Sequence, residues 1–233
     1  MNEIIFDIKN FSYTTDEELD LSFIPMLQRR KLNKFGRAAI YTMNKVYENM
    51  PVNIVFASEY GDVERVEKLI NQRKEDGEVS PAGFSASVHN AAVGFFSLLK
   101  GINTSYNAIS AGKKTVSAGL LESILSKNAL FCYTESLGGL KSVSLLICEN
   151  KNGNYILCEN SENLPVSDCF EDLISFLEGR TDVFVSELYL IKRMKTLTPT
   201  PSPRGRGEVF NEGEKASDQY LKNPTNINAE GEK

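Results

Sequence analysis

Apolar residues recur every three or four positions in four segments of the chain, and short apolar runs separate these segments. The three-to-four-residue period is typical of helices that bury one face. The uninterrupted short runs are typical of strands buried in a sheet. The pattern therefore predicts helices at residues 34–49, 63–72, 87–100 and 117–126, and strands at residues 52–57 and 104–110.

The remaining part of the folded region is predicted to be rich in strands. Residues 150–154 contain Asn-Gly and are typical of a hairpin turn. Because strands and helices alternate in the middle of the chain while hairpins close it, we expect an α/β fold with a mixed β-sheet packed against helices. The additional predicted elements are strands at residues 3–8, 129–133, 143–148, 155–158 and 183–191, and a helix at residues 169–177.

The composition changes sharply after Lys195. Residues 196–233 are rich in Pro, Gly, Asn, Glu and Lys, and their apolar residues follow neither a helix nor a strand period. Such a segment cannot bury enough apolar surface to offset the entropy of ordering, so we expect a folded domain at residues 1–195 and a disordered Pro/Gly-rich tail. Residues 197–208 resemble a translated interspersed repeat of bacterial reading frames, without a function of its own. A Pro-rich ligand or an Arg-Gly nucleic-acid-binding tail is the alternative.

Composition and charge disfavour several kinds of site and partner. The chain has one His, no Trp, four Cys and a net charge of −5. One imidazole cannot form a His-rich centre and no Cys-x-x-Cys pair is present, so we expect no metal site. The negative charge gives no general attraction to nucleic acid. No signal peptide opens the chain and no apolar run reaches the about 18 residues that span a bilayer, so we expect a cytoplasmic protein with reduced cysteines.

Residues 80–94 are the most informative stretch, because a loop of small residues leads into an apolar helix. The start of a helix carries partial positive charge and unpaired N–H groups, which suits a nucleophile or an anion. The segment from Gly83 to Ser87 nearly matches the Gly-x-Ser-x-Gly elbow of α/β-hydrolases. His89 follows Ser85 by four residues, whereas a triad needs a His from elsewhere in the fold. We expect His89 to be a buried, hydrogen-bonded helix residue; an acyltransferase or hydrolase that uses Ser85 is the alternative.

Several short motifs are spread between residues 58 and 147. They are Ser58 with Gly61, Ser80-Pro81, Phe84-Ser85 with Ser87-Val88-His89-Asn90-Ala91, Gly94, Ala111-Gly112, residues 117–122, residues 133–135 and residues 143–147. Together they resemble the N-terminal domain of β-ketoacyl synthases, in the short form often called a chain-length factor. The resemblance covers residues 23–149 and continues more loosely to residue 195. It implies a thiolase-like half-fold.

The resemblance also implies where catalytic groups would lie. In a ketosynthase, a strand-to-helix junction presents a Cys at a helix N-terminus, where the dipole lowers the thiol pKa and the thiolate takes an acyl group from acyl carrier protein. The second half of such an enzyme supplies two histidines. Here the junction is expected at Phe84-Ser85-Ala86, which has no Cys, and all four cysteines follow at least forty residues later. The resemblance therefore implies a ketosynthase-like chain without the catalytic apparatus.

The implied function is that of a non-catalytic subunit. Such a subunit pairs with an active β-ketoacyl synthase as a heterodimer and limits chain length in fatty-acid, aryl polyene or polyketide-type elongation. No cofactor is implied except the phosphopantetheine that acyl carrier protein brings. A stand-alone acyl-carrier-protein binding module is a further alternative. The residues expected at an acyl tunnel or partner interface are Phe84, Ser85, Ser87, Val88, His89 and Asn90; the apolar segments 88–99 and 117–125 either join them or pack in the core.

One basic cluster lies near the start of the predicted helix at residues 34–49. Its residues are Arg29, Arg30, Lys31, Lys34 and Arg37. No aromatic residues are interleaved with these cations, which disfavours nucleic acid as the partner. Since acyl carrier proteins are acidic, the resemblance implies that Arg29, Arg30, Lys31 and Arg37 contact one. A solvated basic surface is the ordinary interpretation.

Overall fold

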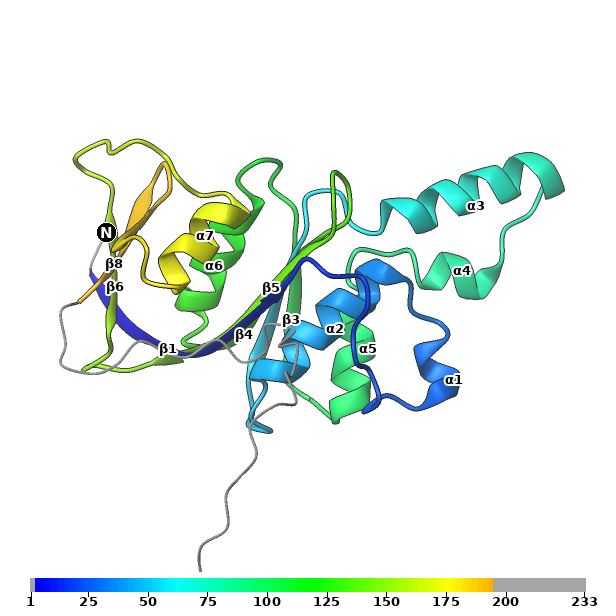
Figure 1. Cartoon of the computed structure of the whole chain (residues 1–233), viewed down its shortest axis with the longest axis horizontal. Helices are drawn as coiled ribbons and strands as arrows, with labels where there is room; N and C mark the ends of the chain where they lie inside the picture. Colours follow the sequence, from blue (N-terminus) through cyan, green and yellow to red (C-terminus); the bar gives the residue numbers. More distant parts are fainter. Residues whose placement is uncertain (1–2, 195–233) are drawn as a thin grey trace, which may run out of the picture.

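A single mixed sheet of eight strands forms the centre of the fold (Figure 1). The computed structural model describes residues 3–194, so the predicted tail at residues 196–233 lies outside the described residues. The strands are β1 (Ile4–Thr14), β2 (Asn53–Ala57), β3 (Tyr106–Ile109), β4 (Asn128–Glu135), β5 (Lys141–Glu149), β6 (Tyr155–Glu159), β7 (Val183–Val185) and β8 (Tyr189–Arg193). Their order across the sheet is β3-β2-β4-β5-β1-β6-β8-β7.

The pairing of the strands divides the sheet into two parts. β2 runs parallel to both β3 and β4. The other pairs are antiparallel, including the hairpin of β7 and β8 at the far edge. The parallel part requires crossover helices, whereas short turns join most of the antiparallel part. This arrangement confirms the expected α/β fold with a mixed sheet.

Helices cover both faces of the sheet. They are α1 (Met26–Arg29), α2 (Lys34–Val46), α3 (Val63–Asp76), α4 (Pro81–Ser85), α5 (Ala91–Lys100), α6 (Thr115–Leu125) and α7 (Phe170–Leu177). α2 and α5 share one apolar core with the sheet, and α6 and α7 share the other. In Figure 1 these two pairs lie on opposite sides of the curved sheet.

The contact of α6 with the sheet is unusually close. Gly119 has no side chain, and a Cβ atom there would lie 2.7 Å from Phe131 and 2.8 Å from Ala57. Only glycine allows this approach, because real Cβ contacts are longer. Beyond α6, the hydroxyl of Tyr189 donates a hydrogen bond of 2.6 Å to the carbonyl of Ser117 and ties β8 to the helix. α6 is therefore a core helix of the fold.

On the opposite face, buried hydroxyl groups join α2 to the sheet. Thr42 of α2 lies 3.0 Å from the hydroxyl of Ser142 and 2.9 Å from that of Ser144, both on β5. Ser142 in turn lies 2.8 Å from the hydroxyl of Thr134 on β4. These small residues bring the helix close to the strands while the hydroxyls satisfy one another. The core on this face is thus partly polar.

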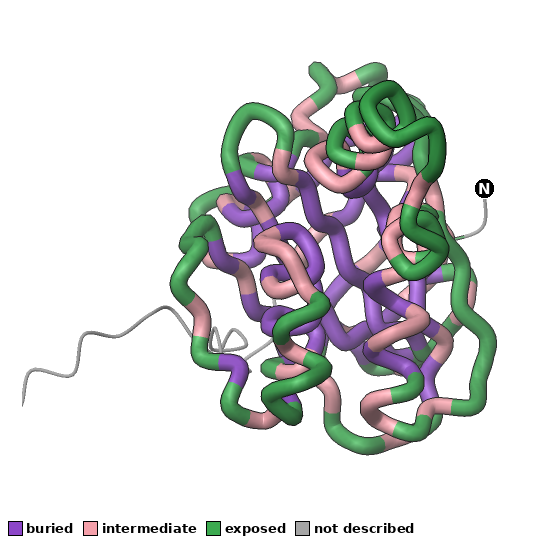
Figure 2. Tube along the Cα trace, turned by 90° about the vertical axis from the view of Figure 1, so that its right-hand side faces the viewer, coloured by how far each residue is buried: buried purple, intermediate pink, exposed green. Residues whose placement is uncertain are grey.

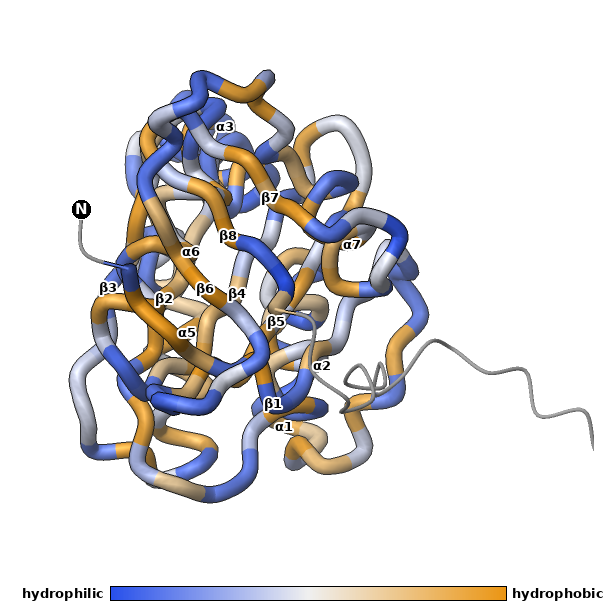
Figure 3. Tube along the Cα trace, turned by 90° about the vertical axis from the view of Figure 1, so that its left-hand side faces the viewer, coloured by the Kyte–Doolittle hydropathy of each residue, from blue (hydrophilic) through white to orange (hydrophobic). Residues whose placement is uncertain are grey.

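At the antiparallel end of the sheet, aromatic rings and an arginine pack α7 against the strands. Phe6 stacks on Tyr155, and the ring of Phe176 from α7 meets Tyr155 edge-on. Arg193 lies over both Tyr155 and Phe176 and donates a hydrogen bond of 2.7 Å to the carbonyl of Phe176. Figure 3 faces this end and shows apolar residues along β6 and β7, with polar residues at the end of β8. The rings and the guanidinium seal the edge between α7 and the sheet.

Several predicted boundaries were wrong, each for a local reason. β1 extends to Thr14, well beyond residues 3–8, because a register shift between Ile8 and Asn10 breaks the alternation on which the prediction relied. The predicted strand at residues 183–191 is a hairpin of β7 and β8. The predicted helix at residues 87–100 begins only at Ala91. The other helices and strands lie where the pattern predicted them, with shifted ends.

Candidate functional site

The segment that drew attention in the sequence lies on an arm outside the sheet. α3 and α4 project from the carboxyl end of β2, and neither helix has a buried residue. Figure 2 faces this arm and shows it mainly as exposed and intermediate. α4 begins where Ser80 accepts a hydrogen bond from the N–H of Gly83, with Pro81 in the first turn. The predicted loop at residues 80–83 is therefore the start of a short helix.

Ser85 is the last residue of α4 and is exposed. The preceding element is the helix α3 rather than a strand, so the expected strand-to-helix junction at Phe84-Ser85-Ala86 was wrong. Among the described residues, no hydrogen bond joins Ser85 to His89. A hydroxyl needs an adjacent base to become a nucleophile. Within residues 3–194, no hydrogen bond joins the Ser85 hydroxyl to such a base.

His89 lies in a turn and fastens that turn to the sheet. Its Nε2 atom is 3.3 Å from the carbonyl oxygen of Ile109, and its ring meets that of Phe56 edge-on at 5.9 Å. A side chain on Gly61, whose φ is +69°, would meet Nδ1 of His89 at 3.1 Å. His89 is thus partly buried and bonded, as expected, but it precedes α5 instead of lying on a helix.

The strand that leads directly into a buried helix is β3. Residues 110–114 connect it to α6, and all five are exposed. Thr115 accepts a hydrogen bond of 2.9 Å from the N–H of Ala111 and donates one of 2.6 Å to the carbonyl of Gly112. A strand-to-helix junction of the kind that the family resemblance led us to expect is therefore found here, about 25 residues after the expected position. The residues at this junction include no Cys.

The surroundings of three cysteines favour the protonated thiol. Burial raises the pKa of Cys132 on β4 and that of Cys148 on β5. Burial, together with a hydrogen bond of 2.9 Å to Asp172, raises the pKa of Cys169 to about 11. Each of these thiols is therefore protonated at neutral pH. Within residues 3–194, no three His, Cys, Asp or Glu residues gather as metal ligands would, and no helix is long and apolar enough to cross a membrane.

Two motifs of the family resemblance meet at the carboxyl ends of β2 and β4. Glu135 is only 5% exposed, and its carboxylate accepts hydrogen bonds from the hydroxyl of Ser58 at 3.1 Å and the N–H groups of Glu59 and Tyr60 at 2.9 and 3.2 Å. Ser58 in turn accepts a hydrogen bond of 2.9 Å from the N–H of Gly61. The sequence pointed to both motifs, but their spacing gave no signal that the carboxylate fixes the turn.

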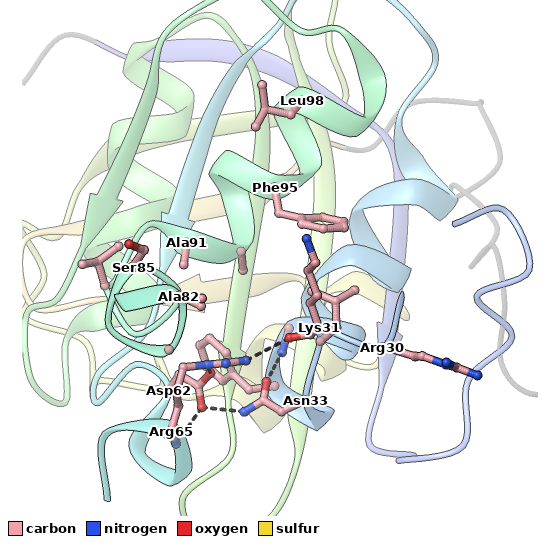
Figure 4. A pocket seen from close by; sticks show the side chains of 17 residues that line it. Arg30, Lys31, Asn33, Asp62, Arg65, Ala82, Ser85, Ala91, Phe95 and Leu98 are labelled. Atoms are coloured by element: carbon pink, nitrogen blue, oxygen red, sulfur yellow. Dashed lines mark hydrogen bonds and ion pairs between the residues drawn. The ribbon is translucent and has the colours of Figure 1, made fainter. Parts of the chain in front are cut away.

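Parts of the two predicted sets of site residues line one cavity. The cavity lies between α2, α4 and α5 and has a volume of about 640 Å³ (Figure 4). Arg30 and Lys31 of the basic cluster border it together with Ser85 and Val88. The predicted residues outside its lining are Arg29, Arg37, Phe84, Ser87, His89 and Asn90. Arg37 instead donates a hydrogen bond of 3.1 Å to the carbonyl of Leu32 and holds the loop before α2.

Three further residues of this cavity were missed in the sequence. Asp62 accepts a hydrogen bond of 2.6 Å from Asn33 and forms an ion pair of 2.9 Å with Arg65. Arg65 also donates to the carbonyl of Lys31 at 3.3 Å. The Asp-x-x-Arg spacing indicates only a helix cap, because Asn33 and Lys31 come from a distant loop. The network fixes α3 to the loop that begins α2.

Comparison with known families identifies the chain. The N-terminal domain of β-ketoacyl synthases matches residues 8–129, more than half of the chain. The chain therefore belongs to the family of β-ketoacyl synthase N-terminal domains, as the motifs indicated. No curated protein matches it.

Solved structures confirm the fold. The chain is similar to a chain in the structure of the ketosynthase ApeO in complex with its chain length factor ApeC from Xenorhabdus doucetiae. The identity is 18% and the TM-score 0.64, over 82% of this chain and 100% of the other. It is also similar to a chain of AntDE:AntF, a type II PKS acyl-carrier protein in complex with its ketosynthase, at 13% identity and a TM-score of 0.50, over 64% of this chain and 63% of the other. The expected thiolase-like fold is thus confirmed.

Proposed function

We propose that the chain is a non-catalytic, chain-length-factor-type subunit that pairs with an active β-ketoacyl synthase in fatty-acid, aryl polyene or polyketide-type elongation. One observation carries this proposal: the exposed junction from β3 into α6 holds Ala111 and Gly112 and no Cys. The single His of the chain is engaged with the carbonyl of Ile109. Acyl transfer to a thiolate, followed by decarboxylation, has no group here to perform it.

An open sheet edge supports the heterodimer. β3 pairs with β2 on one side only, and Tyr106, Asn107 and Ala108 are exposed. The carbonyls of Ser105 and Ile109 accept hydrogen bonds from β2, so the alternation of the strand turns the N–H of Ala108 toward the open edge. An exposed strand edge is a template for a strand of another chain. We place the ketosynthase at this edge, next to the exposed start of α6.

We propose that the arm and the turn after α4 add exposed apolar side chains to the interface with the ketosynthase. Phe84 is 61% exposed and Val88 is 46% exposed, although both are large apolar residues. We assign these two side chains to contacts with the partner or its acyl chain. Ser87 donates a hydrogen bond of 2.8 Å to the carbonyl of Phe84, and His89 holds the following turn, so these two residues position the apolar pair. Ser85 and Asn90, which belong to the same stretch of chain, complete the proposed interface.

Acyl carrier protein is the second proposed partner, and it brings the phosphopantetheine. Arg30 and Lys31 are exposed and adjacent in the chain, beside Arg29. A cationic surface of this kind complements the acidic surface of a carrier protein. Arg37 is bonded to the carbonyl of Leu32, so its proposed role is to hold the basic loop. The proposed setting is the bacterial cytoplasm.

The direct test is co-expression with a neighbouring ketosynthase that has the Cys and both His. We expect the two chains to co-elute in size-exclusion chromatography. Ala108→Pro removes the outward N–H and is expected to abolish co-elution, whereas Ala108→Ser keeps that N–H and retains it. Separate elution of the unchanged chains contradicts the heterodimer. In that case, binding of acyl carrier protein to this chain alone would support the stand-alone carrier-protein binding module.

A second test addresses the non-catalytic role. An acyl-carrier-protein probe that acylates nucleophiles is expected to label the ketosynthase and not this chain. Labelling that disappears in Ser85→Ala would instead support the acyltransferase or hydrolase. In the active complex, Phe84→Ala is expected to shift the products toward longer chains because it removes bulk near the acyl path. Leu137→Ala, a similarly exposed leucine in the turn between β4 and β5 and outside the proposed interface, is the matched control.

A further inference from the structure

We propose that the cavity between α2, α4 and α5 binds a single-chain amphiphile with a small anionic head, specifically the anion of a free long-chain fatty acid. Its volume of about 640 Å³ lies within the usual range of small-molecule sites. The cavity has a cationic end and an apolar end. The cavity shares Arg30, Lys31 and Val88 with the proposed partner contacts, but ligand binding to the chain alone can be measured without either partner.

The cationic end adjoins a recess of about 210 Å³. Arg30, Lys31, Arg65 and Lys68 line this recess, and Asp62 balances only the charge of Arg65. Within residues 3–194, the other three cations form no ion pair. The first turn of α2 also borders the cavity and adds the positive end of a helix dipole. The recess therefore attracts an anion and is small enough to suit a single carboxylate.

The apolar end is formed by α5 and the turn before it. Leu98 is 85% exposed and Val88 is 46% exposed, and both line the cavity together with Phe95. Figure 4 shows Lys31 reaching toward Phe95, whereas Arg30 points away from the other labelled side chains. Leaving a leucine so exposed forgoes the stabilisation that its burial would contribute. An alkyl chain that starts at Lys31 would cover this surface.

The cationic end and the apolar end together determine which class of ligand the cavity fits. An alkyl chain without a charged head would leave the cations unused, and a small anion without a chain would leave Leu98 and Phe95 exposed. The side chains therefore complement a carboxylate with a long alkyl tail, in charge as well as in polarity. Acyl carrier protein would also meet the cations, but its acyl chain is held on phosphopantetheine and has no free carboxylate, whereas a free fatty acid carries the carboxylate and the tail in one molecule. Binding of dodecanoate to the chain alone distinguishes the two.

The test uses the full chain and a reporter inside the cavity. Because the chain has no Trp, Leu98→Trp introduces a single indole at the apolar end. Titration with dodecanoate below its micelle concentration is expected to change the Trp emission in a saturable way. Dodecanol, which lacks the charge, is expected to bind at least tenfold more weakly, and butyrate, which lacks the tail, is expected not to bind. Equal binding of dodecanoate and dodecanol, or no saturation, would overturn the proposal.

Charge-neutral variants then test the cationic end by calorimetry. Lys31→Gln with Lys68→Gln is expected to weaken dodecanoate binding at least tenfold. The matched control is Lys113→Gln with Lys151→Gln, two exposed lysines outside the cavity lining, and it is expected to bind as the unchanged chain does. Leu98→Asp is expected to abolish binding without affecting folding, because the site is exposed. A double variant with unchanged affinity would refute the assigned head-group site.

Discussion

Two segments of this protein lead from a loop into an apolar helix, and the two helices pack differently against the sheet. Residues 80–100, the outer segment, form α4, a turn and α5; α4 has no buried residue, and α5 buries Val93 and Phe96 but leaves Leu98 exposed to solvent. Residues 106–125 form β3 and α6, and α6 packs so closely that Gly119 touches the side chains of the sheet. Both helices bury one face in a core, but only α6, the inner helix, lies so close to the sheet that it requires glycine. Apolar character alone therefore does not tell how closely a helix packs on the sheet.

The comparison has a functional consequence. The sequence directs attention to the outer segment, because Ser85 and His89 are the residue types that carry out catalysis. The structure instead finds the geometry for a nucleophile at the inner segment, where Ala111 and Gly112 occupy the junction. Ser85 and His89, whose side chains could take part in catalysis, are thus separated from the strand-to-helix junction that would activate a nucleophile. This separation supports the proposed non-catalytic role.

The largest effect is expected from adding a side chain to the inner helix. Gly119→Leu places its Cβ within 3 Å of Phe131 and Ala57 and its remaining atoms in space the sheet already fills. We expect a loss of at least about 3 kcal/mol in the free energy of unfolding, or failure to fold. Chemical denaturation followed by circular dichroism measures it.

The matched change on the outer helix is Gly94→Ala. An added Cβ there would meet only the hydroxyl of Tyr106, at an ordinary 3.7 Å. Because alanine favours the helical backbone, we expect a gain of up to about 1 kcal/mol. If both glycine variants were equally harmful, the distinction between an inner and an outer helix would be wrong.

A smaller effect is expected at the turn that joins the outer segment to the sheet. His89→Ala removes the hydrogen bond to Ile109 and the ring contact with Phe56. We expect a loss of about 1–3 kcal/mol in the free energy of unfolding. Ser85→Ala, four residues earlier and exposed, is expected to change it by less than about 0.5 kcal/mol. Thermal melting of the two variants side by side would contradict the structural role of His89 if their midpoints were the same.

The sequence was sufficient for much of the fold and for less of the site. Periodicity located α2, α6 and most strands, because each buries a continuous face. It missed the extent of β1, since the irregularity near Lys9 interrupts the alternation, and it missed α4, which has no buried face to create a period. These failures are local and follow from the way apolar patterns arise.

The candidate site was harder to predict because its contacts join distant segments. The hydrogen bond between Asn33 and Asp62 spans 29 positions, and that between Ser58 and Glu135 spans 77. No spacing within a single segment indicates such pairs. The basic cluster and Ser85 were identified separately, but only the folded chain places Arg30, Lys31 and Ser85 around one cavity. The residue types of the candidate site were thus predictable from the sequence, whereas their proximity in the folded chain was not.

The smallest expected effect concerns a third helix start, at Cys169 before α7. A helix dipole lowers a thiol pKa, but burial and the hydrogen bond to Asp172 raise the pKa of Cys169 to about 11. Because the raised pKa favours the protonated form, about 0.1% of this thiol is ionised at pH 8. We expect iodoacetamide to alkylate Cys169 slowly at pH 8 and progressively faster as the pH approaches 11, which mass spectrometry of the modified peptide measures.

The variant Asp172→Asn separates the two causes of this raised pKa. It removes the carboxylate that accepts the hydrogen bond from the thiol at 2.9 Å, and it leaves the partial burial of Cys169 in place. We expect the rate of alkylation at pH 8 to rise severalfold, with little change in stability. Asp182→Asn, an exposed carboxylate away from Cys169, is the control and is expected to leave the rate unchanged. A Cys169 that already reacts rapidly at pH 8 in the unchanged chain would show that α7, unlike the junction before α6, presents an activated thiol.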